Sequence, residues 1–340
     1  MYKPKFAISQ HLSKLIDEIS ALRERIISSS LQTAWKPALQ KEMEIKSAMG
    51  SSAIEGYVLS LPEVTALASG SNLDRKLNLT ERAVVNYISA LRYLSKNSDK
   101  KSITTADICK LHKIIGEGAV EHGAAGVYRG IQNYVVNISG GVIYTPPAAA
   151  KVPGLMVEFA DWINDEAALN LPVISSGIIH YRFVEIHPFA DGNGRVARAL
   201  GTWELLRRKF DTLHIFAIDD IIYEHKKSYY SASNSVQKEN GDLTLWLEFY
   251  LEIVAESLDR GWKRIISLPK SGNLEKLFLT PKQEKLLMLL RDSEGLSAKD
   301  MASILKVTVQ GAHFLLKPLV EAHIVRRFGG KKTGKYGLCK

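Results

Sequence analysis

Cysteine is scarce in this sequence: its 340 residues include only Cys109 and Cys339. Two cysteines this far apart allow at most one disulfide and form no metal knuckle, which excludes a disulfide-stabilised secreted scaffold. The first ten residues, MYKPKFAISQ, also lack the continuous apolar segment of a secretory signal. We therefore expect a protein of a reducing compartment, the cytoplasm.

Long apolar runs and two common enzyme signatures are missing too. No stretch approaches the ~18 apolar residues of a membrane-spanning helix, so we expect no membrane partner. The pattern G-x-x-x-x-G-K-[ST] is absent, which counts against a P-loop nucleotide-binding fold. The absence of H-E-x-x-H counts against a zinc metalloprotease in the same way.

The composition that is present is typical of a globular protein with a basic balance. Hydrophobic residues make up 46% and charged residues 24% of the chain, and the net charge is +9. The length predicts two or three domains. The positive charge favours anionic partners such as nucleotides, nucleic acid or acidic proteins, although a merely basic surface would give the same balance.

Helical periodicity dominates the chain. Apolar residues recur at helical spacing from about residue 9 to residue 49, with charged residues between them. Gly56 is expected to end the helical stretch before it, and Thr80 to cap the helix that follows it. The same pattern returns up to residue 268, so we expect a mainly α fold.

One β signal and one change of composition divide the chain. Residues 133–147 contain two β-rich runs around the letters SGG, which predicts a hairpin. Residues 269–281 are a candidate linker, followed by three helical patterns and a basic, glycine-rich end with the outline of a winged helix. We expect a helical N-terminal region at 1–100, a core at 101–268 and a winged-helix-like domain at 274–340.

Residues 187–198, HPFADGNGRVAR, concentrate the chemistry. Glycines before a helix let the backbone approach an anion, and the first N–H groups of the helix favour phosphate. Arg195 and Arg198 lie three residues apart and could clamp two phosphates. Asp191 is a hard oxygen ligand suited to Mg²⁺, and His187 titrates near neutral pH and can accept a proton. These residues predict phosphoryl or nucleotidyl transfer.

This stretch resembles the signature of the Fic family at every specified position. The segments AAGVYRG, YTPP and SYYSASNSVQ resemble the family's hairpin approach, hairpin end and adenine-side helix, so the resemblance covers roughly residues 30–265. It implies a helical Fic bundle with a short β-hairpin flap. The implied activity is transfer of AMP from ATP to a serine, threonine or tyrosine hydroxyl of a target protein, with Mg²⁺ as cofactor.

The resemblance also implies residue roles. His187 takes the place of the general base, Asp191 that of the Mg²⁺ ligand, and Arg198 lies nearest the γ-phosphate. The implied ATP contacts are Glu55, His187, Gly192, Asn193, Gly194, Arg195, Val196, Ala197, Arg198, Tyr229, Tyr230 and Gln237. The implied target-docking flap consists of Val142, Ile143 and Tyr144.

Ser51, Glu55 and Gly56 match the family's short inhibitory pattern, [S/T]-x-x-x-E-[G/N]. A helix end with a capping glycine would give the same letters. The inhibitory interpretation is that the Glu55 carboxylate occupies Arg198, the group that should hold the γ-phosphate.

We therefore expect an autoinhibited protein adenylyltransferase. Two alternatives stay open: removal of AMP, with Glu55 positioning water, and a DNA-binding regulator that senses nucleotide. The third helix of the C-terminal segment has few base-reading side chains, and such domains also dock proteins or dimerise. Self-modification, a homodimer and the identity of the target stay open as well.

Overall fold

The protein is described from a computed structural model, for residues 2–29, 35–69, 76–121, 123–136, 141–210, 214–268, 279–322, 324–330 and 334–339. The first helices and strands are α1 (Gln10–Ile27), α2 (Lys36–Ile54), α3 (Leu61–Ala68), α4 (Leu79–Lys96), α5 (Thr105–Gly116), β1 (Val135–Val136) and β2 (Val142–Tyr144). They are followed by α6 (Val152–Asp165), α7 (Pro172–Ile186), α8 (Asn193–Arg207), α9 (Ile218–Glu224), α10 (Lys226–Lys238) and α11 (Thr244–Ile266). The last elements are α12 (Pro281–Arg291), α13 (Ala298–Leu305), α14 (Val309–Glu321), β3 (Val325–Phe328) and β4 (Lys335–Leu338).

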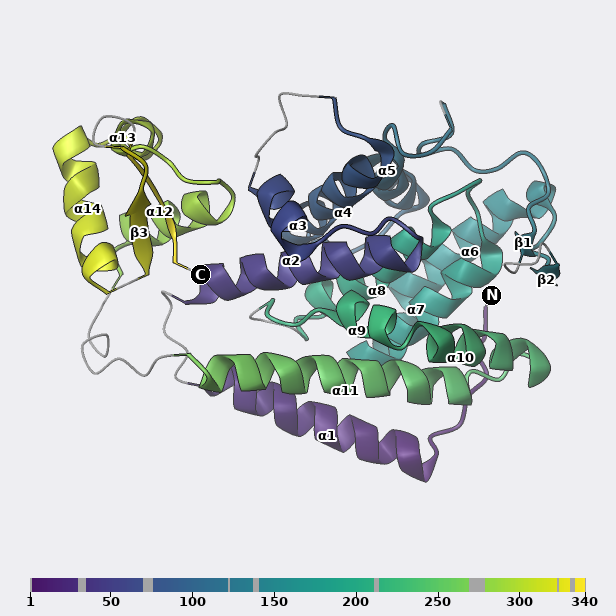
Figure 1. Ribbon diagram of the computed structural model, residues 1–340. Helices are drawn as coiled ribbons and strands as arrows, with labels where there is room; N and C mark the ends of the chain where they lie inside the picture. Colours follow the sequence, from purple (N-terminus) through teal and green to yellow (C-terminus); the bar gives the residue numbers. More distant parts are fainter. Residues whose placement is uncertain are drawn as a thin grey trace.

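Two hydrophobic cores hold these elements together. The larger core runs from Leu12 to Ile265 and takes in helices α1 to α11, whereas the smaller runs from Leu286 to Tyr336 in the α12–β4 unit. Helices α7 and α8 pack against each other at the centre of the larger core (Figure 1). Helix α8 is buried along most of its length, so the loop that precedes it is fixed by its surroundings.

The N-terminal helical stretch consists of two helices, where the sequence pattern predicts one from residue 9 to 49. Helix α1 ends at Ile27, and α2 begins at Lys36 with Pro37 in its first turn, a position where a missing N–H costs nothing. The two helices have different partners: α1 packs on α11, whereas α2 packs on α4 and α9. Both helices bury apolar residues, and apolar spacing alone does not reveal the break.

Capping side chains begin several of the helices. Asn78 caps α4: its side-chain oxygen accepts the Glu81 N–H, and the Glu81 carboxylate accepts the Asn78 N–H. The predicted cap, Thr80, instead lies inside the first turn of α4. Thr104 and Asp107 form the same reciprocal pair at the start of α5.

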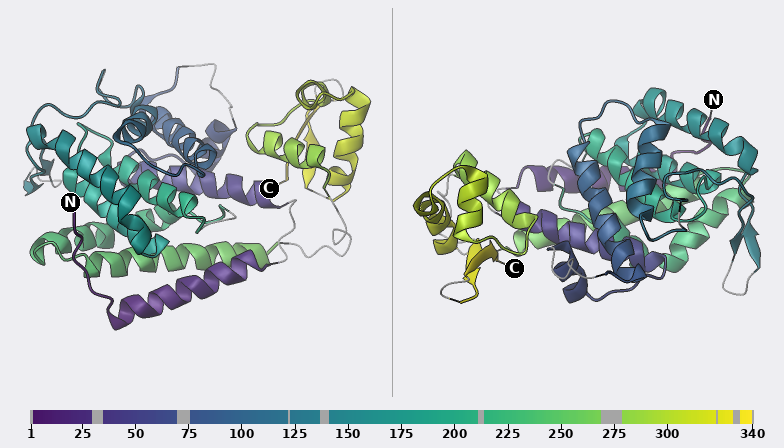
Figure 2. Two further views of the ribbon diagram at one scale, coloured as in Figure 1. Left: turned by 180° about the vertical axis from the view of Figure 1, so that it is seen from behind. Right: turned by 90° about the horizontal axis from the view of Figure 1, so that it is seen from above.

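A short hairpin and a C-terminal unit lie at opposite ends of the molecule (Figures 1 and 2). Strands β1 and β2 pair antiparallel, as predicted, although residues 137–140 of the expected turn lie outside the described residues. Helices α12, α13 and α14 match the three predicted helical patterns, and the basic, glycine-rich end forms the antiparallel pair β3–β4. Within the described ranges, none of the helices combines the length and apolar character needed to cross a membrane.

Gly50 marks a close approach between α2 and α9. A Cβ atom at this position would lie 2.5 Å from the Asp219 carbonyl oxygen, whereas one at Gly154 in α6 would meet nothing within 4 Å. We predict that Gly50→Ala lowers the free energy of unfolding by about 1–3 kcal/mol, although alanine is the better helix former. The control, Gly154→Ala, should cause no loss. Urea unfolding of both variants checks this, and equal effects would contradict the close approach.

Candidate functional site

The loop between α7 and α8 contains the motif residues in a tight, partly left-handed conformation. His187 directly follows α7 with φ 50° and ψ 57°, and Gly192 precedes α8 with φ 80°. The left-handed region is costly for a residue with a Cβ atom, so the surroundings must hold His187 there. Such a residue at a loop of this composition is typical of a functional site.

Asn193 closes this loop with its side chain. Its amide oxygen accepts the Phe189 N–H and its amide nitrogen donates to the Phe189 carbonyl, both at 2.9 Å. Phe189 is fully buried and stacks on His112, with ring centroids 3.6 Å apart. The side-chain amide of Asn193 therefore holds the loop, and its backbone N–H belongs to the unpaired first turn of α8.

His112, which sequence reasoning missed, holds the loop from α5. Its Nδ1 accepts the Gly126 N–H at 2.8 Å, so the ring proton is on Nε2, which donates to the Asp191 carbonyl at 3.0 Å. Burial lowers the pKa of His112 to about 4, which keeps this neutral form. No local pattern marks it, because its partners lie far away in the sequence.

The His187 ring is oriented so that one nitrogen faces away from the backbone. Nδ1 lies 3.2 Å from the Val184 carbonyl oxygen, which can only accept, so Nδ1 carries the proton and Nε2 has the free lone pair. Burial lowers the pKa of His187, and the nearby Arg129 acts in the same direction. The ring is therefore neutral, and able to take a proton, at neutral pH.

A candidate anion site lies at the first turn of α8. Because α8 begins at Asn193, the N–H groups of Asn193, Gly194 and Arg195 have no partner within the helix. Arg195 and Arg198 are 1% and 3% exposed. Three of their buried nitrogen atoms, Nε and Nη1 of Arg195 and Nη1 of Arg198, have no hydrogen-bond partner among the described residues. Buried cations with unused donors favour an anionic ligand.

Asp191 lies at the rim of this site. Its Oδ1 accepts the Gly192 N–H at 2.6 Å, and its Oδ2 lies 3.5 Å from Nη2 of Arg195. The Asp191 side chain is 59% exposed, so the carboxylate can reach a ligand or an ion from solvent.

Glu55 is held at the end of α2 by a Schellman motif. The Gly56 N–H bonds the Ala53 carbonyl and the Tyr57 N–H bonds the Ser52 carbonyl, with Gly56 at φ 92°. The glycine therefore does cap a helix end, as one interpretation of the sequence held. The cap also fixes the direction in which Glu55 leaves the helix.

The Glu55 carboxylate pairs with Arg198. Oε1 of Glu55 lies 2.7 Å from Nη2 of Arg198, which also donates to the Ser51 carbonyl at 2.9 Å, and Nε of Arg198 donates to the Ser51 hydroxyl at 2.8 Å. Asp219, missed from the sequence, lies 3.6 Å from Nε of the same arginine. Burial raises the pKa of Asp219 to about 6 despite this cation. The structure thus brings Ser51, Glu55 and Arg198 together.

The same carboxylate also lies over the first turn of α8. A Cβ atom at Gly194 would lie 2.3 Å from Oε1 of Glu55, so only glycine leaves room for it. Burial alone would raise the pKa of Glu55, but Arg198, with Arg195 and Lys226 further away, outweighs it and lowers the pKa. Glu55 is therefore ionised at neutral pH and acts as an anion within the anion site.

Lys226, also missed from the sequence, fixes the end of α2. Its Nζ donates to the carbonyl of Ile54, the last residue of the helix, at 2.5 Å. A cation at this place satisfies a carbonyl that the helix leaves unpaired and complements the helix dipole. Lys226 thus holds the residue directly before Glu55.

The other predicted nucleotide residues lie in different surroundings. The side chains of Val196 and Ala197 are fully buried, so only their backbone can contact a ligand. Tyr229 is buried, and its hydroxyl lies 3.0 Å from Nε2 of His180. Tyr230 and Gln237 are exposed on α10.

The hairpin is attached to the loop at its base. The Tyr144 hydroxyl donates to the Glu185 carbonyl at 2.7 Å, whereas Val142 and Ile143 are exposed. Asn133, before β1, donates to the Phe189 carbonyl at 3.0 Å. The predicted flap therefore borders the candidate site through Tyr144 of β2, which contacts the end of α7, and through the chain before β1, which contacts the loop.

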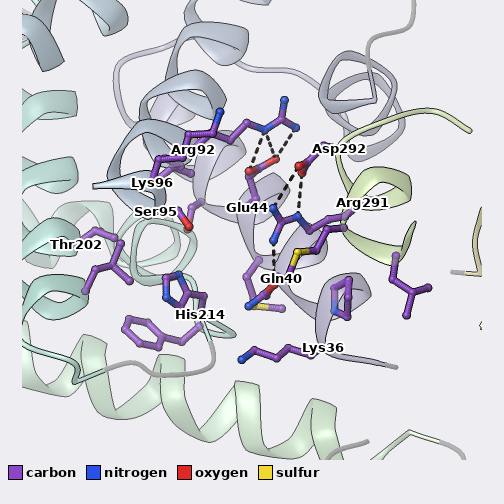
Figure 3. Close-up of a pocket in the computed structure, with 18 of the residues that line it drawn as sticks. Lys36, Gln40, Glu44, Arg92, Ser95, Lys96, Thr202, His214, Arg291 and Asp292 are labelled. Atoms are coloured by element: carbon purple, nitrogen blue, oxygen red, sulfur yellow. Dashed lines mark hydrogen bonds and ion pairs between the residues drawn. The ribbon is translucent and has the colours of Figure 1, made fainter. Parts of the chain in front are cut away.

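A cavity of about 600 Å³ lies elsewhere, between α2, α4 and α12 (Figure 3). Most of its charged lining is paired within the protein: Arg92 binds Glu44, and Arg291 binds Asp292 and Gln40. Its described lining includes none of residues 187–198. The cavity is therefore separate from the candidate site.

Residues 102–205 match the Fic/DOC family, a stretch that includes the whole loop motif. The chain carries a Fic/DOC family domain. The family resemblance that the sequence predicts is thus confirmed.

Relatives and solved structures agree with this family. The chain is 27% identical over 256 residues to a protein adenylyltransferase Fic of Nematostella vectensis, covering 74% of this chain and 56% of the relative. It is 30% identical to one from Drosophila willistoni, covering 71% and 45%. The chain spans about half the length of the curated relatives it matches.

The mainly helical Fic fold is seen in solved structures as well. A Fic family protein from Desulfovibrio desulfuricans matches with a TM-score of 0.69 and 24% identity, covering 99% of this chain and 98% of that chain. Fic-1 from C. elegans matches with a TM-score of 0.59 and 26% identity, covering 75% and 71%.

The lowered pKa of Glu55 predicts how pH affects its contribution to stability. The contribution should be complete above the ordinary carboxyl pKa of 4.5 and should be lost as pH falls through the lower pKa of the folded state. We expect Glu55→Gln to cost about 1 kcal/mol at pH 7, because water screens a side chain that is 32% exposed. The cost should shrink as the pH falls below that ordinary value. Thermal unfolding of both proteins between pH 3 and 7 measures it.

The matched control is Glu24→Gln, which removes a surface pair 3.0 Å from Arg23 with Glu24 69% exposed. It should have little effect at any pH. A Glu55→Gln cost that equals the cost of the control, or that does not shrink as the pH falls below 4.5, would contradict the pairing with Arg198.

Proposed function

We propose that this protein transfers AMP from ATP to a hydroxyl group of a target protein, and that Glu55 inhibits the transfer. One observation carries the proposal: the Glu55 carboxylate pairs with Arg198 and reaches the first turn of α8. A carboxylate held in an anion site competes with any other anion for that site. The names of the distant relatives, protein adenylyltransferases, support the same reaction class.

In this reaction the acceptor hydroxyl oxygen forms a bond to the α-phosphorus, and the bond from that phosphorus to the pyrophosphate oxygen breaks. Nε2 of His187 takes the hydroxyl proton, because Nδ1 is bound to the Val184 carbonyl. The N–H groups of the first turn of α8, together with Arg195 and Arg198, stabilise the charge on the phosphates. Arg198 is the group assigned to the γ-phosphate.

Mg²⁺ fits this site if the substrate supplies most of its ligands. Among the described residues, no three histidine, cysteine or acidic side chains cluster as a metal site. Asp191 would hold the ion with one carboxylate, and phosphate oxygens and water would complete its shell, as is usual for Mg²⁺. When bound, the ion would offset part of the charge of the triphosphate.

Inhibition follows from the competition for Arg198. While Glu55 binds this guanidinium, the γ-phosphate has one cation fewer, and the triphosphate is not drawn into the position that presents its α-phosphorus to His187. Release requires the end of α2 to move or the carboxylate to turn away. Removal of AMP is a second candidate, because the Glu55 side chain is 32% exposed and could position water.

The remaining contacts and the domain division complete the proposal. Tyr229, Tyr230 and Gln237 would border the base of the nucleotide, and the flap of Val142, Ile143 and Tyr144 would dock the target. We propose the division into residues 1–100, 101–268 and 274–340, with a winged helix as the last part.

DNA binding is not favoured, because α14 has Lys317 as its only lysine or arginine and its Phe314 side chain is 80% exposed.

Removing the Glu55 carboxylate should activate transfer. We predict that Glu55→Gly raises AMP incorporation from α-labelled ATP and Mg²⁺, into itself or lysate proteins, by about 5- to 150-fold. The reason is that Arg198 then becomes available to the triphosphate. Glu166→Gly is the matched control, because Glu166 also directly follows a helix, α6, and should leave incorporation unchanged.

Two further measurements distinguish AMP transfer from the other candidate functions. His187→Ala, added to Glu55→Gly, should reduce incorporation by about 10²–10⁴-fold and leave ATP binding intact. Label from γ-labelled ATP should not be incorporated. If Glu55→Gly incorporates no more AMP than the unchanged protein, the inhibitory role is wrong, and loss of AMP from a modified target would favour the removal reaction.

A further inference from the structure

Arg129 is a buried arginine whose side-chain hydrogen bonds, within the described ranges, all go to backbone carbonyl groups. Its Nε donates to the His187 carbonyl at 2.8 Å, its Nη1 to the Ile131 carbonyl at 3.1 Å and its Nη2 to the Pro147 carbonyl. Its own N–H donates to the Pro188 carbonyl at 2.9 Å. Arg129 is 5% exposed, and no ion pair with a carboxylate is recorded for it in the described part of the chain.

A buried guanidinium without a carboxylate partner is unusual, because burial of a charge is costly unless it is compensated. Carbonyl oxygens from separate segments compensate it here: the loop after α7, the chain before β1 and the chain after β2. The planar fork of an arginine can reach all of them at once, which a lysine with a single nitrogen cannot do. The position thus depends on arginine specifically.

These contacts join the loop between α7 and α8 to the chain at both ends of the hairpin. Asn133 and Tyr144 add ties of the same kind, to the carbonyls of Phe189 and Glu185. Arg129 is the residue among them that also fixes the carbonyl of His187, the residue in the left-handed conformation. It therefore restrains both the proposed base and the proposed docking strand.

We propose that Arg129 is a positioning residue that sets the distance between the docked target hydroxyl and the His187 ring. This inference rests on the proposed function, in which the hairpin presents the hydroxyl and His187 takes its proton. Arg129 contacts neither the first turn of α8 nor Arg195 and Arg198, so it should affect transfer without affecting nucleotide affinity.

The charge of Arg129 gives the proposal a second readout. Three charged groups face His187: Arg129, which lowers its pKa, and Glu55 and Asp191, which raise it. Removing the guanidinium should move the His187 titration upwards, towards the ordinary value of 6.5. A lysine at position 129 would keep the positive charge, and with it the lowered pKa of His187, but it could not bridge the separate carbonyl groups.

The test uses Arg129→Gln and Arg129→Lys in the full chain with Glu55→Gly. Both variants should lose AMP transfer by about 10- to 100-fold, because a small displacement of reacting groups has effects of this size. Their ATP affinity, measured by calorimetry, should stay within about twofold. Arg208→Gln is the control for loss of a bridging arginine away from the site: Arg208 donates to the carbonyls of Ala167 and Asn170 and also pairs with Glu204, and its replacement should leave transfer unchanged.

His187 titration, followed by NMR, is measured on the same variants. The pKa of His187 should rise in Arg129→Gln and stay low in Arg129→Lys. Transfer within twofold of the parent in both variants, or an equal loss of ATP affinity, would overturn the proposal. If Arg129→Gln does not fold, the lysine variant alone decides by its transfer rate. If Glu55→Gly itself transfers no AMP, the proposed function fails. The titration then tests Arg129 by itself: a His187 pKa that does not change in Arg129→Gln would reject the influence of Arg129 on His187.

Discussion

The buried guanidinium of Arg198 is the group on which the candidate site depends. An arginine that is 3% exposed requires compensation, and Glu55, Ser51 and Asp219 supply it from α2 and α9. Burial lowers the pKa of Arg198, but Glu55 and, to a smaller extent, Asp219 outweigh it and hold the pKa above its usual value. The cation is therefore permanent, and what can change is which anion it binds.

The surrounding structure makes one of these anions replaceable. Asp219 is 2% exposed and belongs to the core, whereas the Glu55 side chain is 32% exposed at the end of a helix. The Schellman motif at Gly56 and the bond from Lys226 to Ile54 hold that helix end without closing it from solvent. Glu55 can therefore give way to a phosphate, while Asp219 keeps the arginine in place.

The sequence predicts the parts of the site that are continuous along the chain. The loop motif, the hairpin and the helix that begins within residues 187–198 follow from glycines, turn residues and apolar spacing. His112, Arg129, Asp219 and Lys226 do not, because each acts through a carbonyl or a guanidinium more than twenty residues away. The break between α1 and α2 escapes prediction for a related reason: two helices with different partners share one periodicity.

The competition for Arg198 can be measured directly by comparing nucleotides that differ only in their outer phosphates. Calorimetric titration of ATP and AMP, each with Mg²⁺, into the unchanged protein and Glu55→Gly gives four dissociation constants. If Glu55 competes with the outer phosphates, the substitution should tighten ATP binding by about 5- to 150-fold and leave AMP binding nearly unchanged. An equal change for both nucleotides, or none for ATP, would contradict the account.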